Sequence, residues 1–250
     1  MKQIPNDLSR DRVAALDLLD LGRFDVGPGK RLIPICAWLI TLDSGRRILL
    51  DTGFPPAYAT DERAAALADG LDGFGRLVGF GPQHTILGAL ATQGLTASDI
   101  SHVILSHSHI DHVGGLACFP DAEIILSACE HALPRPLYFG KASPMAWPEA
   151  RYATIDKTTE ICAGLRLYPT PGHTPGHLSA LVRLTGAAFV LAIDAINRHS
   201  EPAEGYPDAA DPVTAALSGR RLRRLAGRYK ATLIPGHEPI GAVAAEMTAR

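Results

Sequence analysis

The chain has 250 residues, of which 46% are hydrophobic, and its formal charge is −2 at pH 7. This length and hydrophobic content can bury one large core, so we expect a single domain over residues 1–250. The nearly balanced charge, and the absence of the roughly 18 consecutive apolar residues that cross a membrane, argue against a nucleic-acid or membrane partner.

Neither a targeting signal nor disulfides are expected. The first seven residues lack the apolar core of a signal peptide, which predicts a cytoplasmic protein. The cysteines show no C-x-x-C spacing, so buried thiols are expected rather than disulfides or metal ligands. They are Cys36, Cys118, Cys129 and Cys162.

The first half of the chain opens with a hairpin-like pair of strands. Residues 37–42 and 47–51 are apolar runs on either side of a turn at 43–45, a pattern typical of a β-hairpin. Two helices are expected after it, over residues 61–68 and 85–93.

The second half repeats this plan. A capping-box pattern predicts a short helical turn over residues 96–100, which leads into an apolar strand at 103–105. Residues 178–184 and 188–194 then form a second hairpin-like pair, and residues 211–228 are expected to form a helix.

The strand patterns indicate a layered fold. The continuous apolar runs 48–50 and 189–193 predict strands covered on both faces, which requires helices outside two packed sheets. We therefore expect an α/β protein, an αββα sandwich of two mixed β-sheets flanked by helices. The last predicted helix carries an arginine cluster that we interpret as a solvated face, because no aromatic residues interleave with it. The cluster is Arg220, Arg221, Arg223 and Arg224.

Two segments interrupt this regularity, near residues 54–82 and 131–159. Both carry aromatic side chains among glycines or prolines. Long segments of this kind inside a compact domain are often binding loops, so we expect them to form walls of a substrate pocket. The alternative, that their aromatic residues only anchor the loops to the core, stays open.

The densest chemical signal is the stretch of residues 106–112, which reads S-H-S-H-I-D-H. His107 and His109 can converge on one cation, while Asp111 and His112 can turn toward a second. Clustered imidazoles without such partners would be costly to bury, which makes a purely structural role improbable.

Three further candidates each follow an apolar strand: His173, Asp194 and His237. Strand ends meet along one rim of an α/β sheet, so these side chains can join the motif at 106–112. One cation would be held by His107, His109 and His173, the other by Asp111, His112 and His237, with Asp194 bridging the two.

These motifs make the chain resemble the metallo-β-lactamase superfamily, and within it the N-acyl homoserine lactonases, the quorum-quenching lactonases. The resemblance rests on L-L-D-T-G at 49–53, the motif at 107–112, G-H-T-P-G-H at 172–177, Asp194, and P-G-H at 235–237. It implies the metallo-β-lactamase fold. The chain departs from these lactonases at Asn197, where they usually carry a tyrosine.

The resemblance implies a dinuclear metal-dependent hydrolase that opens a lactone ring with a metal-bridging hydroxide. Imidazole and carboxylate ligands without a thiolate favour two Zn²⁺ ions, with Mn²⁺, Co²⁺ or Fe²⁺ as alternatives. Asp111 would ligate and pass a proton to the leaving oxygen, and Asn197 would donate a hydrogen bond to the carbonyl. The expected partner is a small lactone or ester, and the choice between a monomer and a homodimer stays open.

Other hydrolases of the superfamily remain alternatives, namely those that act on esters, thioesters, phosphotriesters or β-lactams. Asp194 argues against the β-lactamases, which lack a bridging carboxylate. Oxidoreductases of this fold typically carry a glutamate at the position of His109 and an added flavin domain, and a non-catalytic binding module would not need a complete ligand set.

Overall fold

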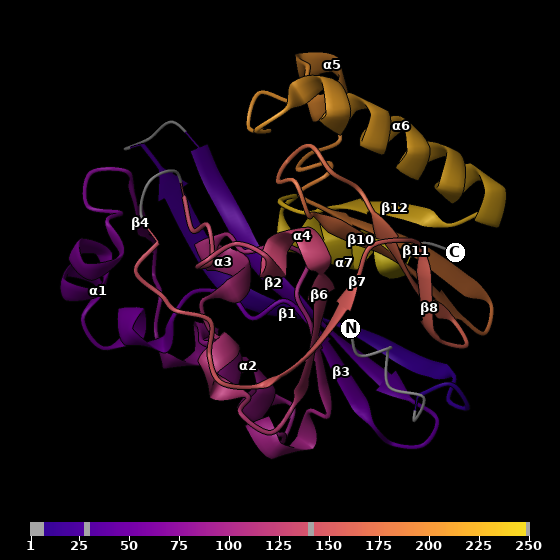
Figure 1. Ribbon diagram of the computed structural model, residues 1–250, viewed down its shortest axis with the longest axis horizontal. Helices are drawn as coiled ribbons and strands as arrows, with labels where there is room; N and C mark the ends of the chain where they lie inside the picture. The colour runs from indigo at the N-terminus through magenta and orange to yellow at the C-terminus, as the bar shows by residue number, and fades with distance from the viewer. Residues whose placement is uncertain (1–7, 28–30, 140–142, 249–250) are drawn as a thin grey trace.

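Two β-sheets pack face to face between outer helices in the computed structural model, which describes residues 8–27, 31–139 and 143–248 (Figure 1). This arrangement confirms the predicted αββα sandwich of two mixed sheets. The first seven residues, which were considered as a signal peptide, lie outside the described residues.

The first sheet has seven strands in the order β4-β1-β2-β3-β5-β6-β7. Its strands are β1 (Val13–Val26), β2 (Arg31–Leu42), β3 (Arg47–Leu50), β4 (Gly75–Leu77), β5 (His102–Ile104), β6 (Glu123–Ser127) and β7 (Arg151–Ile155). The strands from β4 to β3 pair antiparallel, and those from β3 to β7 pair parallel. The long strand β1 was not predicted, because a register shift between Asp20 and Arg23 breaks its alternation of apolar and polar residues.

The second sheet has five strands in the order β12-β11-β10-β9-β8. They are β8 (Thr159–Cys162), β9 (Leu165–Pro169), β10 (Leu178–Leu184), β11 (Ala187–Ile193) and β12 (Thr232–Pro235). The two predicted hairpins are both present, β2 with β3 and β10 with β11. Each sheet therefore contains one of the two repeated strand pairs.

The three longer predicted helices match to within one residue at each end. They are α1 (Glu62–Asp69), α2 (Ile86–Thr92) and α6 (Pro212–Tyr229), and the side chains of Asp61, Thr85 and Asp211 cap their N-termini. The 3₁₀ turns are η1 (Pro56–Ala59), η2 (Pro82–His84), η3 (Ala97–Asp99) and η4 (Leu116–Cys118). The turn η3 lies within the short turn expected at 96–100.

Four helices were not predicted: α3 (Ile110–Val113), α4 (Ala128–His131), α5 (Glu201–Glu204) and α7 (Ile240–Thr248). The first three are single turns, too short to show a helical period. Among the described residues, no helix is long and apolar enough to span a membrane.

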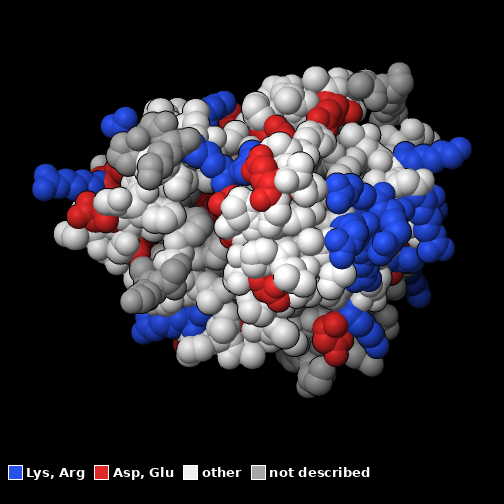
Figure 2. All heavy atoms as spheres, turned by 90° about the horizontal axis from the view of Figure 1, so that it is seen from above, with Lys and Arg blue, Asp and Glu red and all other residues white. Residues whose placement is uncertain are grey.

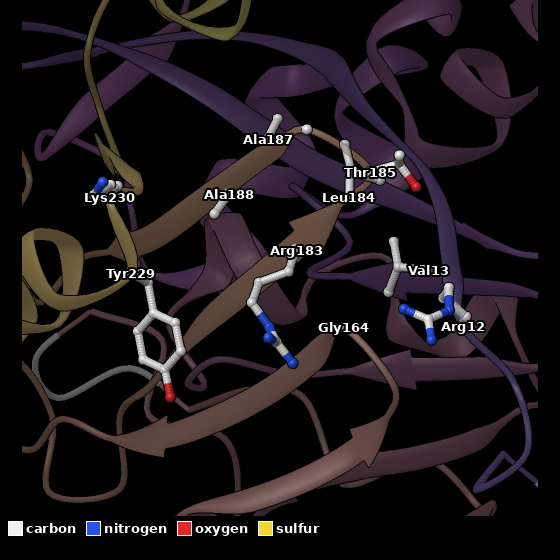
Figure 3. A pocket seen from close by; sticks show the side chains of 11 residues that line it. Arg12, Val13, Gly164, Arg183, Leu184, Thr185, Ala187, Ala188, Tyr229 and Lys230 are labelled. Atoms are coloured by element: carbon white, nitrogen blue, oxygen red, sulfur yellow. The ribbon is translucent and has the colours of Figure 1, made fainter.

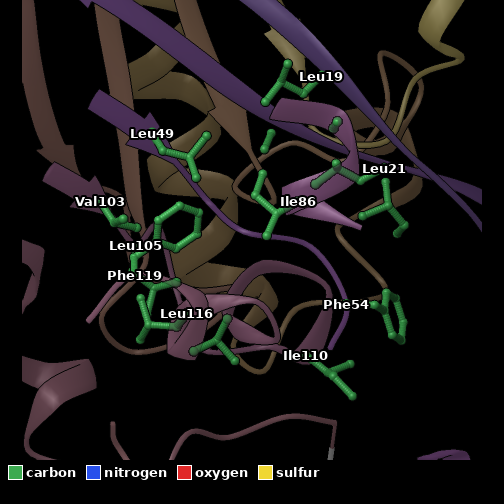
Figure 4. Close-up of a cluster of buried hydrophobic side chains, with 14 of the residues drawn as sticks. Leu19, Leu21, Leu49, Phe54, Ile86, Val103, Leu105, Ile110, Leu116 and Phe119 are labelled. Atoms are coloured by element: carbon green, nitrogen blue, oxygen red, sulfur yellow. The ribbon is translucent and has the colours of Figure 1, made fainter. Parts of the chain in front are cut away.

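Three clusters of buried hydrophobic side chains fill the spaces between the layers of the fold. Alternate strand residues point to opposite faces of a sheet. Leu49 and Val103 therefore pack toward α2 and its neighbours (Figure 4), while Ile48 and Ile104 pack between the sheets. A third cluster lies between the second sheet and α6 and includes Leu222. Burial on both faces is why these strands consist of continuous apolar runs.

The cysteines differ in part from expectation. All four are free thiols, and Cys162 is buried, but Cys129 is exposed. Cys36 and Cys118 are half-buried, and Cys129 lies in the single-turn helix α4, so the prediction of four buried thiols is confirmed only for Cys162.

Candidate metal centre

Four potential ligands gather where the loops after three strands meet. His107 and His109 follow β5, His173 follows β9, and Asp194 follows β11. His173 Nε2 lies 3.0 Å from His109 Nδ1 and 3.3 Å from Asp194 Oδ2, and His107 Nε2 lies 3.9 Å from the same oxygen. These atoms could together hold one cation.

A second group lies on the other side of Asp194. Asp111 Oδ2 is 3.4 Å from His112 Nε2 and 3.7 Å from His237 Nε2. Asp194 approaches this group as well, with Oδ1 3.4 Å from His112 Nε2 and Oδ2 3.1 Å from His237 Nε2. Asp194 is therefore placed between the two groups, and all seven expected ligands are brought together.

The spacing and chemistry of these atoms fit divalent cations. Ligands about 2.0–2.1 Å from a tetrahedral cation lie about 3.3 Å from one another, which is close to the separations found here. His107 Nε2, His112 Nε2, Asp111 Oδ1 and Asp194 Oδ1 are buried without a hydrogen-bond partner. Buried polar atoms are rarely left unpaired, so their convergence indicates that a cation completes the site.

The electrostatics differ between the two ligand groups. In the second group, burial acts to lower the pKa values of His112 and His237, but the neighbouring carboxylates of Asp111 and Asp194 raise them, so a cation bound there would displace a proton. The first group is already in the protonation state that metal binding requires. Burial lowers the pKa values of His107 and His173 well below the usual range and also lowers that of His109. Their imidazoles are therefore neutral at pH 7, as metal binding requires. Burial acts to raise the pKa of Asp194, but the surrounding histidines, His237 and His112 foremost, hold it well below its usual range.

Neighbouring groups fix the orientation of the histidine rings. His112 Nδ1 lies 2.9 Å from Asp51 Oδ2, and His237 Nδ1 lies 2.8 Å from the carbonyl oxygen of Pro34. A proton on each Nδ1 leaves the Nε2 lone pair facing the site. Asp51 also accepts from the backbone N–H and the hydroxyl of Ser106, so it braces the loop.

His177 also braces the site. Its Nε2 accepts from the backbone N–H of Asp194 at 3.1 Å, and its Nδ1 lies 2.9 Å from Thr170 Oγ1. Burial lowers the pKa of His177 to about 3, which keeps the ring neutral and able to accept. This ring therefore holds the backbone of Asp194 in place.

Glu130, in α4, was missed by sequence reasoning. Its carboxylate is fully buried and accepts from the hydroxyls of Ser108 and Thr174 and from the backbone N–H of Gly176. Ser108 lies between two candidate ligands, and Thr174 directly follows His173. Glu130 therefore ties together the two loops that carry the first ligand group, although nothing in its sequence surroundings marks it.

The loop geometry that presents Asp194 is strained. Ile193 has a φ of 51°, which is a rare value for a β-branched residue. A Cβ at Gly236 would lie 2.7 Å from the carbonyl group of Ile193 and 2.8 Å from Asp194 Oδ1. Only glycine therefore fits at 236 without displacing this carboxylate, and strain of this kind is typical of functional sites.

The two groups open on a cavity of about 180 Å³. Besides site residues it is lined by Val26, Ile33, Phe74 and Phe139 on an apolar side, and by Arg31 and Asp208, which form an ion pair. The Phe139 ring lies 5.0 Å from the His109 ring and 5.4 Å from the Phe74 ring. An apolar wall thus extends outward from the metal ligands.

Only some of the aromatic residues considered for the pocket lie there. Phe74 and Phe139, one from each interrupting segment, line the cavity. Phe54 and Tyr58 are buried in the core, which is the alternative role that had stayed open. Part of the second segment, residues 140–142, lies outside the described residues.

Asn197 is buried and lines the cavity. Its Nδ2 donates to Glu201 Oε1 at 2.9 Å, its backbone N–H donates to Glu201 Oε2, and its Oδ1 has no hydrogen-bond partner. The amide of Asn197 therefore faces the cavity three residues after Asp194.

Comparisons with known proteins find relatives of this chain by sequence and by fold. A family model described as the metallo-beta-lactamase superfamily matches residues 33–237. An N-acyl homoserine lactonase of Bacillus thuringiensis is 31% identical over 220 residues, which cover 84% of each chain. Metallo-beta-lactamase domain-containing protein 1 of Xenopus laevis is 32% identical over 162 residues, covering 62% of this chain and 61% of the relative.

Among solved structures, an N-acyl homoserine lactone hydrolase has a similar fold, with a TM-score of 0.79 and 27% identity. The match covers 96% of this chain and 97% of that hydrolase. That structure holds N-hexanoyl-L-homoserine bound at its catalytic metal centre.

Proposed function

The chain belongs to the metallo-β-lactamase superfamily, and from this membership we propose that it is a dinuclear metal-dependent hydrolase that opens the ring of an N-acyl homoserine lactone. The observation that carries the proposal is the pair of ligand groups that share Asp194 and open on a cavity with an apolar wall. Curated relatives named as N-acyl homoserine lactonases support the substrate class.

In this proposal the first cation is held by His107, His109 and His173, and the second by Asp111, His112 and His237, with Asp194 between them. The ligand set contains imidazole and carboxylate groups without a thiolate, which favours Zn²⁺. When bound, a pair of such cations supplies a hydroxide nucleophile near neutral pH and Lewis acidity at the carbonyl oxygen.

The protein's own groups position the substrate. The apolar wall formed by Val26, Ile33, Phe74 and Phe139 suits an acyl chain, and its place beside His109 directs the lactone toward the ligands. An amide nitrogen carries two hydrogens, so Asn197 can hold Glu201 with one and donate the other to the lactone carbonyl.

Asp111 is placed to move the proton. Its Oδ2 lies between His112 and His237, while its Oδ1 has no partner. In the reaction, the oxygen of a water molecule bonds to the carbonyl carbon and the ring C–O bond breaks, while Asp111 accepts the proton that this water gives up and passes it to the leaving alkoxide. The product is an open-chain hydroxy acid.

A hydrolysis panel tests this function. The zinc-reconstituted protein is assayed on N-hexanoyl homoserine lactone, a thioester, a β-lactam and a phosphotriester, and the kcat/KM values are compared. We expect the lactone to have the highest value. A higher kcat/KM for any of the other three would assign the chain to a different hydrolase of the superfamily.

Two variants that each remove one ligand test the site. His109→Ala and Asp194→Ala each remove one ligand and should lower lactone kcat/KM by about 100-fold or more, because a disturbed metal site loses both nucleophile and Lewis acid. Circular dichroism establishes that each variant is folded. Near wild-type activity in a folded variant would show that the site is elsewhere.

A further inference from the structure

The outer face of α6 carries six exposed residues that the proposed reaction does not use. The helix turns its buried side, with Ala215, Ser218, Leu222 and Ala226, toward the second sheet. The opposite side carries residues spaced three or four apart, which form one stripe along the helix. This stripe, called the α6 stripe below, consists of Val213, Leu217, Arg220, Arg221, Arg224 and Arg228.

The stripe is apolar at its N-terminal end and basic at its C-terminal end. Val213 is 75% exposed and Leu217 is 55% exposed, and one helical turn separates them, so they form a small apolar patch. Figure 2 looks onto the side of the molecule on which α6 lies, and the blue Lys and Arg spheres gather toward its right. The arginine cluster noted in the sequence is thus part of a larger two-part surface.

The arginines of the stripe differ in their partners from several arginines elsewhere in the protein. Arg23, Arg46, Arg47 and Arg76, for example, each pair with an aspartate. Within the described part of the chain, no arginine of the α6 stripe forms an ion pair with a carboxylate. Arg221 instead donates to the Pro169 carbonyl and lies over the Tyr168 ring.

A recess beside the stripe is lined by further basic side chains. It has a volume of about 390 Å³ and lies between the turn that joins β10 to β11 and the C-terminal end of α6. Figure 3 shows the Arg12, Arg183 and Lys230 side chains around it. Arg183 and Arg228 lie 5.8 and 5.7 Å from the centroid of the Tyr229 ring, so this ring connects the recess to the stripe.

The arginine and lysine side chains on this face make it strongly positively charged. The whole chain has a formal charge of −2, so this face is opposite in sign to the rest of the molecule. Neighbouring like charges repel one another, and an anionic surface brought against them would relieve that repulsion.

We propose that the α6 stripe and the adjoining recess dock the protein onto an anionic phospholipid bilayer. The arginines and Lys230 would contact lipid phosphates, while Val213 and Leu217 enter the boundary between headgroups and acyl chains. The apolar pair favours a bilayer over a nucleic acid, because exposed aliphatic side chains add nothing to phosphate binding. Surface docking needs no spanning segment, so it is compatible with the lack of a long apolar stretch.

Docking at this face would also bring the reaction near the membrane. The backbone N–H groups of Ala210 and Asp211, at the start of α6, donate to the carbonyls of His173 and Gly172. The docking surface is thus joined to the loop that carries a candidate ligand. Acyl-bearing substrates partition into bilayers, so an enzyme on the surface meets a higher local concentration of them.

Vesicle co-sedimentation of the full chain tests the proposal independently of activity. We expect binding to vesicles of phosphatidylcholine with phosphatidylglycerol, weaker binding as salt rises, and little binding to phosphatidylcholine alone. Each arginine near an anionic surface contributes about fivefold in partitioning. The triple variant Arg220→Gln, Arg224→Gln and Arg228→Gln should therefore partition about 100-fold more weakly.

Two further variants distinguish bilayer docking from general charge attraction and from binding of a soluble polyanion. The triple variant Arg63→Gln, Arg135→Gln and Arg151→Gln makes the same charge change at exposed positions away from α6 and should lose less than about threefold. The variant Val213→Gln and Leu217→Gln should weaken vesicle binding but leave binding to heparin unchanged.

Three results would overturn the proposal. One is no binding of the wild-type chain to anionic vesicles at low salt. A second is an equal loss in the two arginine variants, which would indicate general charge attraction. The third is full vesicle binding by the Val213 and Leu217 variant, which would assign the face to a soluble polyanion.

Discussion

Replacing Glu130 should weaken one metal position and leave the other nearly intact. Glu130 contacts the loops of His107, His109 and His173 through Ser108 and Thr174, and it makes no hydrogen bond to the second ligand group. Glu130→Gln keeps the volume of the side chain but removes its charge and replaces one acceptor oxygen with a donor.

The expected loss of stability follows from the three hydrogen bonds that the Glu130 carboxylate accepts. Hydrogen bonds to a charged acceptor contribute about 1.5–3 kcal/mol each, against about 0.5–1.5 kcal/mol for neutral pairs. Glutamine keeps part of the network, so we expect a loss of about 1–2 kcal/mol in the free energy of unfolding of the metal-free protein. Mutating a residue that holds metal ligands in place typically lowers the metal affinity 10- to 100-fold.

Zinc binding is measured by competition with a chromophoric chelator, which resolves two successive affinities. We expect Glu130→Gln to lower one of them by about 10- to 100-fold and the other by less than about threefold. The exposed Glu149→Gln makes the same charge change and should leave both affinities unchanged.

Two outcomes would refute this reasoning. Equal losses at both positions would mean that Glu130 supports the whole fold rather than one pair of loops. Unchanged affinities in a variant with lowered stability would mean that the loops hold their ligands without this carboxylate.

Three further predictions concern substitutions of Gly236, Asn197 and His177. Gly236→Ala should lower zinc affinity and activity together, because its Cβ would come within 2.8 Å of Asp194 Oδ1; normal zinc titration of that variant would contradict this. Asn197→Ala should lower kcat about 10-fold, roughly 1.4 kcal/mol, without changing metal content, and an unchanged kcat would show that another group contacts the carbonyl. For His177, the folded pKa of about 3 lies below the unfolded value of 6.5, so its contribution to stability falls as pH drops through that interval. In urea denaturation of the metal-free proteins, the wild type should lose about 1.4 kcal/mol more than His177→Gln between pH 7.5 and 5.5, and equal losses would show that His177 is not buried neutral.

The parts of the site that could be predicted from the sequence are those coded by local pattern. The candidate ligands stand directly after apolar runs, and strand ends meet along one rim, so their convergence follows from the layered fold. The hairpins and the longer helices were predicted for the same reason, since alternation and capping residues such as Asp211 act over a few positions.

The parts that were missed depend on contacts between distant segments. Glu130 lies in a single turn of helix, and only the folded chain brings Ser108 and Thr174 to it. The strand β1 is disguised by its bulge, and the choice of Phe74 over Phe54 as a pocket residue depends on how each loop packs. The α6 arginines are exposed, as the interpretation of a solvated face expects, but the sequence does not show that Tyr229 joins Arg228 to Arg183 of the adjoining recess.

The most direct test of the central claim is a zinc titration of the metal-free protein that follows hydrolysis of N-hexanoyl homoserine lactone. Two ligand groups sharing Asp194 predict that the rate rises until two equivalents of zinc per chain are bound and then stays constant, with a product one water molecule heavier than the lactone. A full rate at one equivalent, or no lactone opening at two, would contradict the account.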